Sequence, residues 1–563
     1  RRLRKRGLLP TPPRRVHINE AVCEGCGDCS VKSNCLSVVP HDTEFGEKRQ
    51  IHDPSCNRDY TCLEGDCPSF VTLTPTRRGR SNRRAVGLVR PAPALPRGAL
   101  PEPATSPAGS YGIYFTGIGG TGVVTANRIV AAAAEAAGFR IAGMDQTGLS
   151  QKAGAVVSHL HLLAPGEAPT TASVGPAGAD LYLSGDILQA ANPLHLAKAE
   201  PGRTTAVVNC DVTRTASMLQ GGAAVPDVAT LEQAVSAALG SDRVVFVDST
   251  QIAEAVFADH LLANVVLLGA AFQRGALPLP LACLEDALGR QANPVRNRDA
   301  FTWGRWAAHD PEAVARAVRG AAPPEARQGG GIWDPSPGAL RAARDLVSAR
   351  SLPAGLDDLL VRRAAQVVDY QDSRRAARFL DLVERAAARD DAAEGWALTG
   401  AVASSWFKLL TYKDEYEVAR LHLKADYDAV ARDLGIEGSY RLRYHLHPPT
   451  LRRAGLGRKL PLGKPYEWGF WALARMRRLR GTPFDVFGWD RDRRLERALA
   501  DEYEVLLSGL LAAAPGRPYD ELVRIAASAE SIRGYAAIKE EAARGWRAAL
   551  GAELGHEHAP SPP

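Results

Sequence analysis

The stretch YGIYFTGIGGTGVVTANRIVAAAAEAAG, residues 111–138, decides the fold class of the central part of this chain. A short apolar strand runs into a glycine turn, and an alanine-rich helix follows and ends at Gly138. Strand, glycine turn and helix in this order open a doubly wound α/β domain. Further strands are predicted at FRIAGMD, AVVSHLHLL, DLYLSGD, TTAVVNCD and RVVFVDST, and they alternate with helical stretches. This alternation favours a mostly parallel sheet over residues 109–325.

The glycines of the turn are Gly117, Gly119, Gly120 and Gly122, and they allow two interpretations. In one, they let a cofactor phosphate approach the free N–H groups at the helix start, as in an NAD or FAD site. That site needs an acidic residue about twenty positions later, and Asp145 is near, but the run QTGLSQKAGAVVSH that follows is unlike a ribose-binding turn. The preferred interpretation is close packing of helix against strand.

Working outward toward the N-terminus, seven of the nine cysteines lie between residues 23 and 67. Cys23, Cys26 and Cys29 are each separated by two residues, so a tight loop can point all three thiolates at one centre. Cys67 precedes Pro68, which is where two-cluster ferredoxins carry the remote fourth ligand. These four cysteines are the predicted ligands of one [4Fe–4S] cluster.

Cys35, Cys56 and Cys62 remain as a second metal site, and they supply three thiolates without a fourth. A second cluster would therefore need a non-cysteine ligand or an incomplete cuboid. Structural zinc is the main alternative for the whole cysteine segment, although a third cysteine at the same spacing exceeds what a zinc pair uses. Seven cysteines cannot all pair as disulfides, and no signal peptide indicates an oxidising compartment, so a cytoplasmic protein is expected.

Composition sets limits on the remaining function classes. A hydrophobic content of 45% and a charged content of 23% are those of an ordinary globular protein, and no uncharged apolar run is long enough to span a membrane. The net charge of +6 is concentrated in Pro- and Gly-flanked basic stretches, which favours linkers over nucleic-acid binding. The predicted division is a linker at 1–15, a ferredoxin-like iron–sulfur domain at 16–76, a flexible linker at 77–108, the α/β domain at 109–325, a mainly helical C-terminal domain at 331–550 and a disordered tail at 551–563.

The first residue is Arg, and the tail behind it has no apolar core, so we interpret it as an interior linker and expect the chain to begin partway through a longer protein. In the C-terminal domain, the arginines at 491, 493, 494 and 497 alternate with acidic residues. They are expected to pair with these neighbours, with an anion site for coenzyme A phosphates as the alternative.

Three groups of segments together resemble one known family. INEAVCEGCGDCSVKSNC and SCNRDYTCLEGDCPSF resemble the ferredoxin-like end of the thiamine-bearing part of indolepyruvate ferredoxin oxidoreductase. FTGIGGTGVVTANRIVAAAA and MDQTGLSQKAGAVVSHLHL resemble the gamma module of 2-oxoacid ferredoxin oxidoreductases. TYKDEYEVARLH, LRGTPFDVFGWDRDRRLE and SIRGYAAIKE are similar to the C-terminal domain of the long fused bacterial members.

The resemblance implies an oxidoreductase that decarboxylates aryl 2-oxoacids on thiamine diphosphate and Mg²⁺, forms a coenzyme A thioester and passes electrons to ferredoxin. Its thiamine site needs a Gly-Asp-Gly segment, and the nearest stretch, Ser184-Gly185-Asp186-Ile187, lacks the second glycine. The chain is therefore expected to supply the electron outlet and the gamma module of a homo-oligomeric enzyme, to work with a separate thiamine-domain region, and to be inactive alone. No catalytic residue is assigned. The alternatives are a zinc-binding assembly scaffold and an NAD-linked iron–sulfur electron-transfer subunit.

Overall fold

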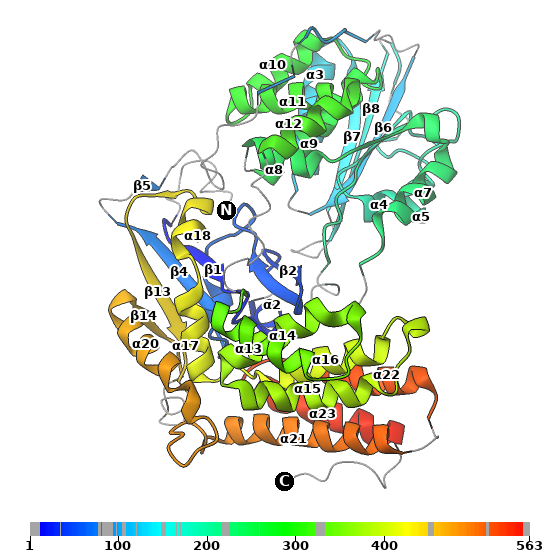
Figure 1. Ribbon diagram of the computed structural model, residues 1–563. Coiled ribbons are helices and arrows are strands. Elements are labelled where there is room, and N and C mark those ends of the chain that lie inside the picture. Colours follow the sequence, from blue (N-terminus) through cyan, green and yellow to red (C-terminus); the bar gives the residue numbers. More distant parts are fainter. Residues whose placement is uncertain are drawn as a thin grey trace.

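The computed structural model describes most of the chain: residues 12–33, 35–76, 80–81, 94–96, 98–103, 109–119, 121–147, 154–164, 166–168, 171–215, 218, 225–257, 259–321, 333–448, 455, 457–513 and 517–554. These residues form an α/β body and a second body that combines the cysteine-rich segment with the C-terminal region (Figure 1). Within these ranges no helix is both long and apolar enough to cross a membrane.

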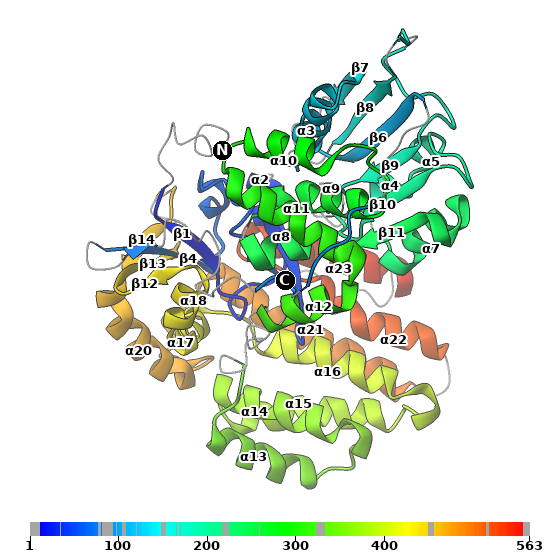
Figure 2. The same ribbon diagram turned by 90° about the horizontal axis from the view of Figure 1, so that it is seen from above.

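The α/β body is built on a six-stranded sheet of order β11-β10-β9-β6-β8-β7, which fans out in Figure 2. Its strands are β6 (Tyr111–Ile118), β7 (Arg140–Thr147), β8 (Ala155–Leu163), β9 (Leu181–Ser184), β10 (Thr205–Asn209) and β11 (Val244–Val247). Strands β6, β9, β10 and β11 are parallel neighbours, as predicted. Strand β8 is antiparallel to both β6 and β7, so the sheet is mixed on one side.

Both faces of this sheet are covered because its central strands alternate apolar residues to opposite sides. Phe115 and Leu183 face one core, and Tyr114 and Tyr182 face the other. The first core is closed by α3 (Val123–Ala136), α8 (Ser249–Phe257), α9 (Ala263–Gln273), α10 (Leu281–Gly289), α11 (Pro294–His309) and α12 (Pro311–Ala321). The second is closed by α4 (Ile187–Ala190), α5 (Pro193–Leu196) and α7 (Val228–Leu239).

The cysteine-rich segment is small and has little regular structure. It contains β1 (Arg15–Ile18), α2 (Asp28–Ser33), β2 (Val38–Thr43), β3 (Gly46–Ile51) and β4 (Phe70–Pro75). Strands β2 and β3 form an antiparallel hairpin, and β1 pairs with β4. The described cysteines of this segment lie on the loops between these strands and on α2.

The cysteine-rich segment and the C-terminal region share one sheet, of order β1-β4-β13-β14. Strand β13 (Tyr440–Leu446) pairs antiparallel with β4, and β14 (Leu460–Gly463) pairs with β13. The predicted division between a domain at 16–76 and one at 331–550 therefore separates strands that hydrogen-bond to each other. A further short bridge joins β5 (Arg80–Ser81) to β12 (Ile436–Glu437).

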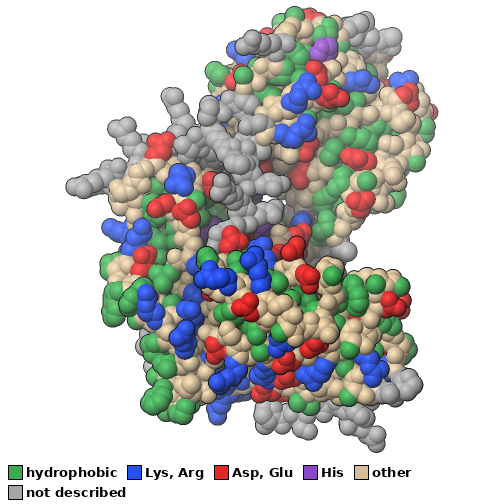
Figure 3. All heavy atoms as spheres, viewed as in Figure 1, with side chains coloured by type: hydrophobic (Ala, Val, Ile, Leu, Met, Phe, Trp, Pro, Cys, Tyr) green, Lys and Arg blue, Asp and Glu red, His purple; other side chains and the backbone are tan. Residues whose placement is uncertain are grey.

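The rest of the C-terminal region is helical, as its three- and four-residue apolar spacing predicts. Its helices are α13 (Pro337–Ser348), α14 (Asp357–Tyr370), α15 (Ser373–Ala387), α16 (Ala397–Leu410), α17 (Glu415–Lys424), α18 (Tyr427–Asp433), α20 (Glu467–Arg475), α21 (Arg491–Ala512), α22 (Tyr519–Ser528) and α23 (Ala537–Leu554). Trp406 and Tyr503 stack at the centre of the helical layer, with ring centroids 6.0 Å apart. Over this layer Lys and Arg side chains alternate with Asp and Glu (Figure 3), as in the contact of Arg378 with Glu504 at 2.6 Å.

Two predicted linker boundaries need correction. Residues 98–103, inside the predicted flexible linker 77–108, lie against the α/β body, where the carbonyl oxygen of Pro101 accepts from Gln273 at 2.8 Å and from Arg305 at 3.3 Å. The predicted tail at 551–563 begins too early, because α23 continues to Leu554 and buries it. Residues 1–11 of the predicted linker 1–15 lie outside the described residues.

Candidate functional site

Cysteine side chains from four loops meet in one small apolar core of the cysteine-rich segment. Cys23 and Cys62 are buried with Val16, Val38 and Phe70, and Cys29, Cys35 and Cys67 pack against that core. The loop that carries Cys23 and Cys26 turns sharply at Gly25, whose φ is +71°. A Cβ at this position would lie 2.0 Å from the carbonyl oxygen of Glu47, so only glycine fits the turn.

The structure brings the four predicted cluster ligands into one electrostatic neighbourhood. Burial raises the pKa of the Cys26 thiol to about 12, and the neighbouring Cys67 and Cys23 add to the rise. Burial also raises the pKa of Cys29, followed by the effects of Cys67, Cys23 and Cys26. The pKa of Cys67 is raised as well, chiefly by burial. These thiols thus stay neutral in this pocket until a bound cation compensates their negative charge.

Hydrogen-bond donors already point at the sulfur atoms. The backbone N–H of Gly25 donates to Cys23 Sγ at 3.3 Å, and the hydroxyl of Ser69 lies 3.0 Å from Cys67 Sγ. Four soft donors in a dry pocket, with N–H and O–H groups directed at the sulfurs, fit an iron–sulfur cluster. Among the described residues no group of three or more His, Cys, Asp or Glu side chains is placed to hold a single metal ion. A cubane does not require such convergence, since each of its irons takes one thiolate.

Two of the other three cysteines share this core, because Cys62 is buried in it and Cys35 packs against it. Burial raises the pKa of Cys62 to about 12, with Cys56 and Cys35 as the next causes. The pKa of Cys56 is raised by burial too, and the backbone N–H of Arg58 donates to its sulfur at 3.4 Å. The thiols that act on Cys62 are thus Cys56 and Cys35, whereas those that act on Cys29 are Cys67, Cys23 and Cys26. The assignment of the cluster ligands stays a prediction.

The C-terminal region supplies neighbours of Cys67 that the sequence analysis did not identify. His422 Nε2 lies 3.0 Å from the carbonyl oxygen of Pro68, and His447 Nδ1 lies 2.6 Å from the carboxylate of Asp66. The ammonium of Lys459 is buried without a hydrogen-bond partner among the described residues. Burial lowers the pKa of Lys459, and Cys67 is the largest of the groups that oppose this effect. No local sequence pattern marks these residues as neighbours of Cys67, because they arrive through the sheet pairing of β4, β13 and β14 and through the packing of α17, which carries His422, against β4.

In the α/β body, the glycine turn is explained by packing at Gly117. A Cβ there would lie 2.8 Å from the side chain of Val123, the first residue of α3. Gly122 has φ +106°, which favours glycine, and Gly119 donates its N–H to the carbonyl oxygen of Gly154 at 2.7 Å. Gly120 lies outside the described residues.

The topology next to this turn differs from that of a dinucleotide-binding unit. In such a unit the strand after the first helix lies directly beside the first strand, whereas here β8 separates β7 from β6. Asp145, on β7, accepts from Ser158 Oγ at 2.6 Å and from Asn127 Nδ2 at 3.2 Å. Its carboxylate is thus occupied by structural hydrogen bonds.

The stretch Ser184–Ile187 does not fit a thiamine diphosphate or Mg²⁺ site. Asp186 caps α4 by accepting from Gln189 N at 3.2 Å, and it accepts from Thr213 N at 2.6 Å. Burial raises its pKa to about 6. A side chain at Gly185 would lie 2.7 Å from Asn264 Oδ1. These residues close the end of the sheet, and no step of thiamine chemistry is assigned to them.

The arginines of α21 pair with neighbouring carboxylates. Arg493 contacts Glu496 and lies 3.2 Å from Glu415. Arg497 lies 3.6 Å from the carboxylate of Asp485. This arrangement favours the ion-pair interpretation over an anion site for coenzyme A.

Comparison with known proteins identifies two segments. Residues 112–305 match the family described as pyruvate ferredoxin/flavodoxin oxidoreductase, and residues 356–552 match a family of unknown function (DUF6537). The chain is 27% identical over 176 residues to indolepyruvate oxidoreductase subunit IorB of Archaeoglobus fulgidus, covering 31% of this chain and 83% of that protein.

Three solved structures are similar to the α/β body. Pyruvate oxidoreductase subunit PORC of Thermotoga maritima is 17% identical, with 35% of this chain and 96% of that chain covered and a TM-score of 0.27. The gamma subunit of keto/oxoacid ferredoxin oxidoreductase from Geobacter sulfurreducens is 22% identical, with 35% and 98% covered and a TM-score of 0.26. A 2-oxoglutarate:ferredoxin oxidoreductase from Magnetococcus marinus, with 2-oxoglutarate, coenzyme A and succinyl-CoA bound, is 18% identical, with 36% and 32% covered and a TM-score of 0.28.

Proposed function

We propose that this chain is the electron-transfer and gamma-module portion of a 2-oxoacid ferredoxin oxidoreductase, because residues 112–305 match the pyruvate ferredoxin/flavodoxin oxidoreductase family and part of the chain is similar to an indolepyruvate oxidoreductase subunit. The observation that supports the electron-transfer role is the grouping of the buried Cys23 with the partly buried Cys26, Cys29 and Cys67, together with donors directed at the sulfur atoms of Cys23 and Cys67.

In this proposal the four thiolates hold one [4Fe–4S] cluster, which supplies one-electron transfer when bound. The protein's own groups set the conditions for that role. Val16, Val38 and Phe70 exclude water from the thiols, and Ser69 and the Gly25 N–H stabilise negative charge on sulfur. Lys459 adds a buried positive charge beside Cys67. Such charges and hydrogen bonds around the sulfurs set the reduction potential.

The substrate side of the proposal rests on the relatives. An indolepyruvate-type enzyme would oxidise an aryl 2-oxoacid to its coenzyme A thioester and deliver the electrons to ferredoxin. The residues of this chain do not fit thiamine diphosphate at Ser184–Ile187, so we place that cofactor and Mg²⁺ on a separate thiamine-domain region. The isolated chain should not reduce a viologen dye with indolepyruvate and coenzyme A, and joining it to that region should restore the activity.

The direct test is anaerobic reconstitution of the purified chain with iron and sulfide. We expect about four irons per chain and a broad absorption at about 400 nm, because only one complete set of four thiolates is present. Cys23→Ser and Cys67→Ser should each abolish this band. Cys56→Ser should retain it, and Cys283→Ser, in a helix of the α/β body, serves as the matched control.

The outcomes separate the alternatives. A colourless protein with about one tightly bound zinc would replace the electron-transfer role by a structural scaffold. A reproducible content of about eight irons would show that a non-cysteine ligand completes the group of Cys35, Cys56 and Cys62, and that the count of one cluster is wrong.

A further inference from the structure

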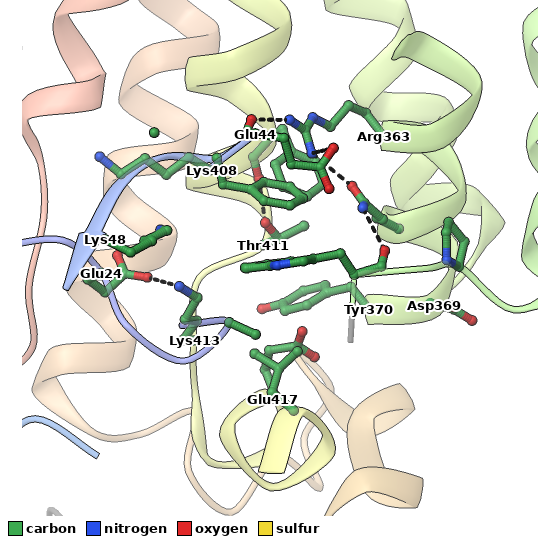
Figure 4. A pocket seen from close by; sticks show the side chains of 18 of the residues that line it. Glu24, Glu44, Lys48, Arg363, Asp369, Tyr370, Lys408, Thr411, Lys413 and Glu417 are labelled. Atoms are coloured by element: carbon green, nitrogen blue, oxygen red, sulfur yellow. Dashed lines mark hydrogen bonds and ion pairs between the residues drawn. The ribbon is translucent and has the colours of Figure 1, made fainter. Parts of the chain in front are cut away.

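A cavity of about 200 Å³ lies between the β2–β3 hairpin and helices α14, α16 and α17, and Glu24, the residue after Cys23, also lines it (Figure 4). We call it the Lys48 pocket. Its walls come from the cysteine-rich segment and from the C-terminal region, which is the part matched only by a family of unknown function. Successive residues of a strand face opposite sides, and Lys48 lines the cavity, whereas Arg49 acts on the Cys29 thiol.

Lys48 is the central feature of this pocket. Its side chain is 6% exposed, and it makes no hydrogen bond or ion pair with any other residue that the structure describes. Burying a cation without a partner is costly. The pKa of Lys48 is lowered to about 7, by burial first and then by Lys413. An anionic ligand in the cavity would remove this cost by supplying the missing charge.

Two more cations of the pocket lack a carboxylate partner. Lys408 Nζ donates to the backbone carbonyl oxygens of Ala529 at 3.3 Å and Glu530 at 2.6 Å. Arg533 likewise donates to the carbonyl oxygens of Glu530 at 2.9 Å and Glu47 at 3.1 Å. Burial lowers the pKa of Lys408 well below its ordinary value, so a bound anion would favour the protonated form of this lysine.

Three carboxylates of the pocket are already engaged. Glu24 lies 2.6 Å from Lys413, which also donates to the carbonyl oxygen of Cys23 at 3.0 Å. Glu417 accepts two hydrogen bonds from Arg420, and Asp369 accepts from the backbone and the hydroxyl of Ser336. These three carboxylates are therefore held by partners other than Lys48, Lys408 and Arg533.

The remaining wall is aromatic. Phe45 stacks on Trp333 with ring centroids 4.1 Å apart, and Phe407 lies 5.7 Å from Phe45. Arg363 lies 3.8 Å above the Phe45 ring and thereby fixes its position. An aromatic wall facing unpaired lysines matches a ligand with an apolar ring at one end and a negative charge at the other.

We propose that the Lys48 pocket binds a small carboxylate with an aromatic body. The cavity is smaller than the roughly 300–1,000 Å³ of sites for drug-sized ligands, which limits the occupant to a single ring with a short acidic chain. The proposal does not depend on the iron–sulfur cluster, because Lys48, Lys408 and the aromatic wall are in place without it.

Isothermal titration calorimetry with the purified full chain tests the proposal. Phenylacetate is the probe, 2-phenylethanol keeps its ring without the charge, and acetate and inorganic phosphate keep a charge without the ring. We expect phenylacetate to bind at least about tenfold more tightly than each of the other three, since ring and charge contribute together. Lys48→Met should weaken phenylacetate binding by about tenfold or more, and Lys48→Arg should retain most of it.

Stability distinguishes a binding lysine from a structural one. Lys48→Met should leave the melting temperature of the ligand-free chain unchanged or higher, because it removes an unpaired buried charge. Lys464→Met, an exposed lysine outside the cavity, is the control and should change neither binding nor stability. Equal binding of phenylacetate and 2-phenylethanol, tighter binding of inorganic phosphate, or unchanged phenylacetate binding by Lys48→Met would overturn the proposal. A lowered melting temperature of Lys48→Met would do so as well.

Discussion

Replacing Arg480 by Met removes the most deeply buried ion pair that we describe in the C-terminal region. Arg480 Nε lies 2.5 Å from Asp414 Oδ2, a second guanidinium nitrogen lies 2.8 Å from Oδ1, and a third donates to the carbonyl oxygen of Tyr370. The guanidinium also lies 3.7 Å above the Tyr370 ring. Both partners of the pair are almost fully buried. Asp414 begins α17 by accepting from Glu417 N at 2.9 Å, so the pair positions the loop that carries Lys413 to the cysteine site.

The expected loss of stability follows from the Asp414 carboxylate, which remains buried after the substitution. After Arg480→Met, the Asp414 carboxylate is buried without its bidentate partner, and loss of one member of a buried pair typically costs about 3–5 kcal/mol. Burial raises the pKa of Asp414, but Arg480 and the other donors outweigh this and hold the pKa below its usual range. For a folding unit of this size that cost corresponds to a fall in melting temperature of about 10 °C.

Thermal unfolding followed by tryptophan fluorescence measures this change, because seven of the nine tryptophans follow residue 325. Arg478→Met, an exposed arginine in the same segment, should shift the transition by less than about 0.5 kcal/mol. Adding Asp414→Asn to Arg480→Met should recover part of the loss, since the amide keeps the helix cap and removes the unpaired charge. A loss below about 1 kcal/mol for Arg480→Met, or a double variant no more stable than the single one, would refute the argument.

Three further predictions concern the cluster, the packing and the pH dependence. Lys459→Met should lower the midpoint potential of the reconstituted protein by about 50–100 mV in a redox titration, because one positive charge near Cys67 is lost; an unchanged or higher potential would contradict this. Gly304→Ala should destabilise the α/β body by about 3 kcal/mol in thermal unfolding, since its Cβ would meet the backbone of α9. A Cβ at Gly400 would meet nothing within 4 Å, so Gly400→Ala should be neutral or stabilising. The pKa of Asp186 is raised to about 6 in the folded state, so the folded chain binds more protons than the unfolded chain between about pH 4 and 6. The free energy of unfolding should therefore fall by about 3 kcal/mol as the pH rises through that window. The melting temperature of Asp186→Asn should lack this fall.

The sequence by itself was enough for the features that depend on near neighbours along the chain. The apolar strand 111–118, the glycine turn and the alanine-rich helix are present as predicted, because strand periodicity and the φ of Gly122 are local properties. The C-x2-C-x2-C spacing likewise places Cys23, Cys26 and Cys29 on one short loop, and the structure brings Cys67 to the same side.

The tertiary structure decided what lies around these local features. Pairing of β4 with β13 puts His447 and Lys459 beside Cys67, and packing of the β2–β3 hairpin on the helical layer creates the Lys48 pocket. The position of β8 between β6 and β7 likewise cannot be inferred from the order of elements along the chain. Periodicity and motif spacing report on conformation over a few residues, whereas these contacts depend on which apolar faces bury each other across hundreds of residues. The spacing of the cysteines therefore predicts which of them are ligands, but the charges that surround them are set by the fold.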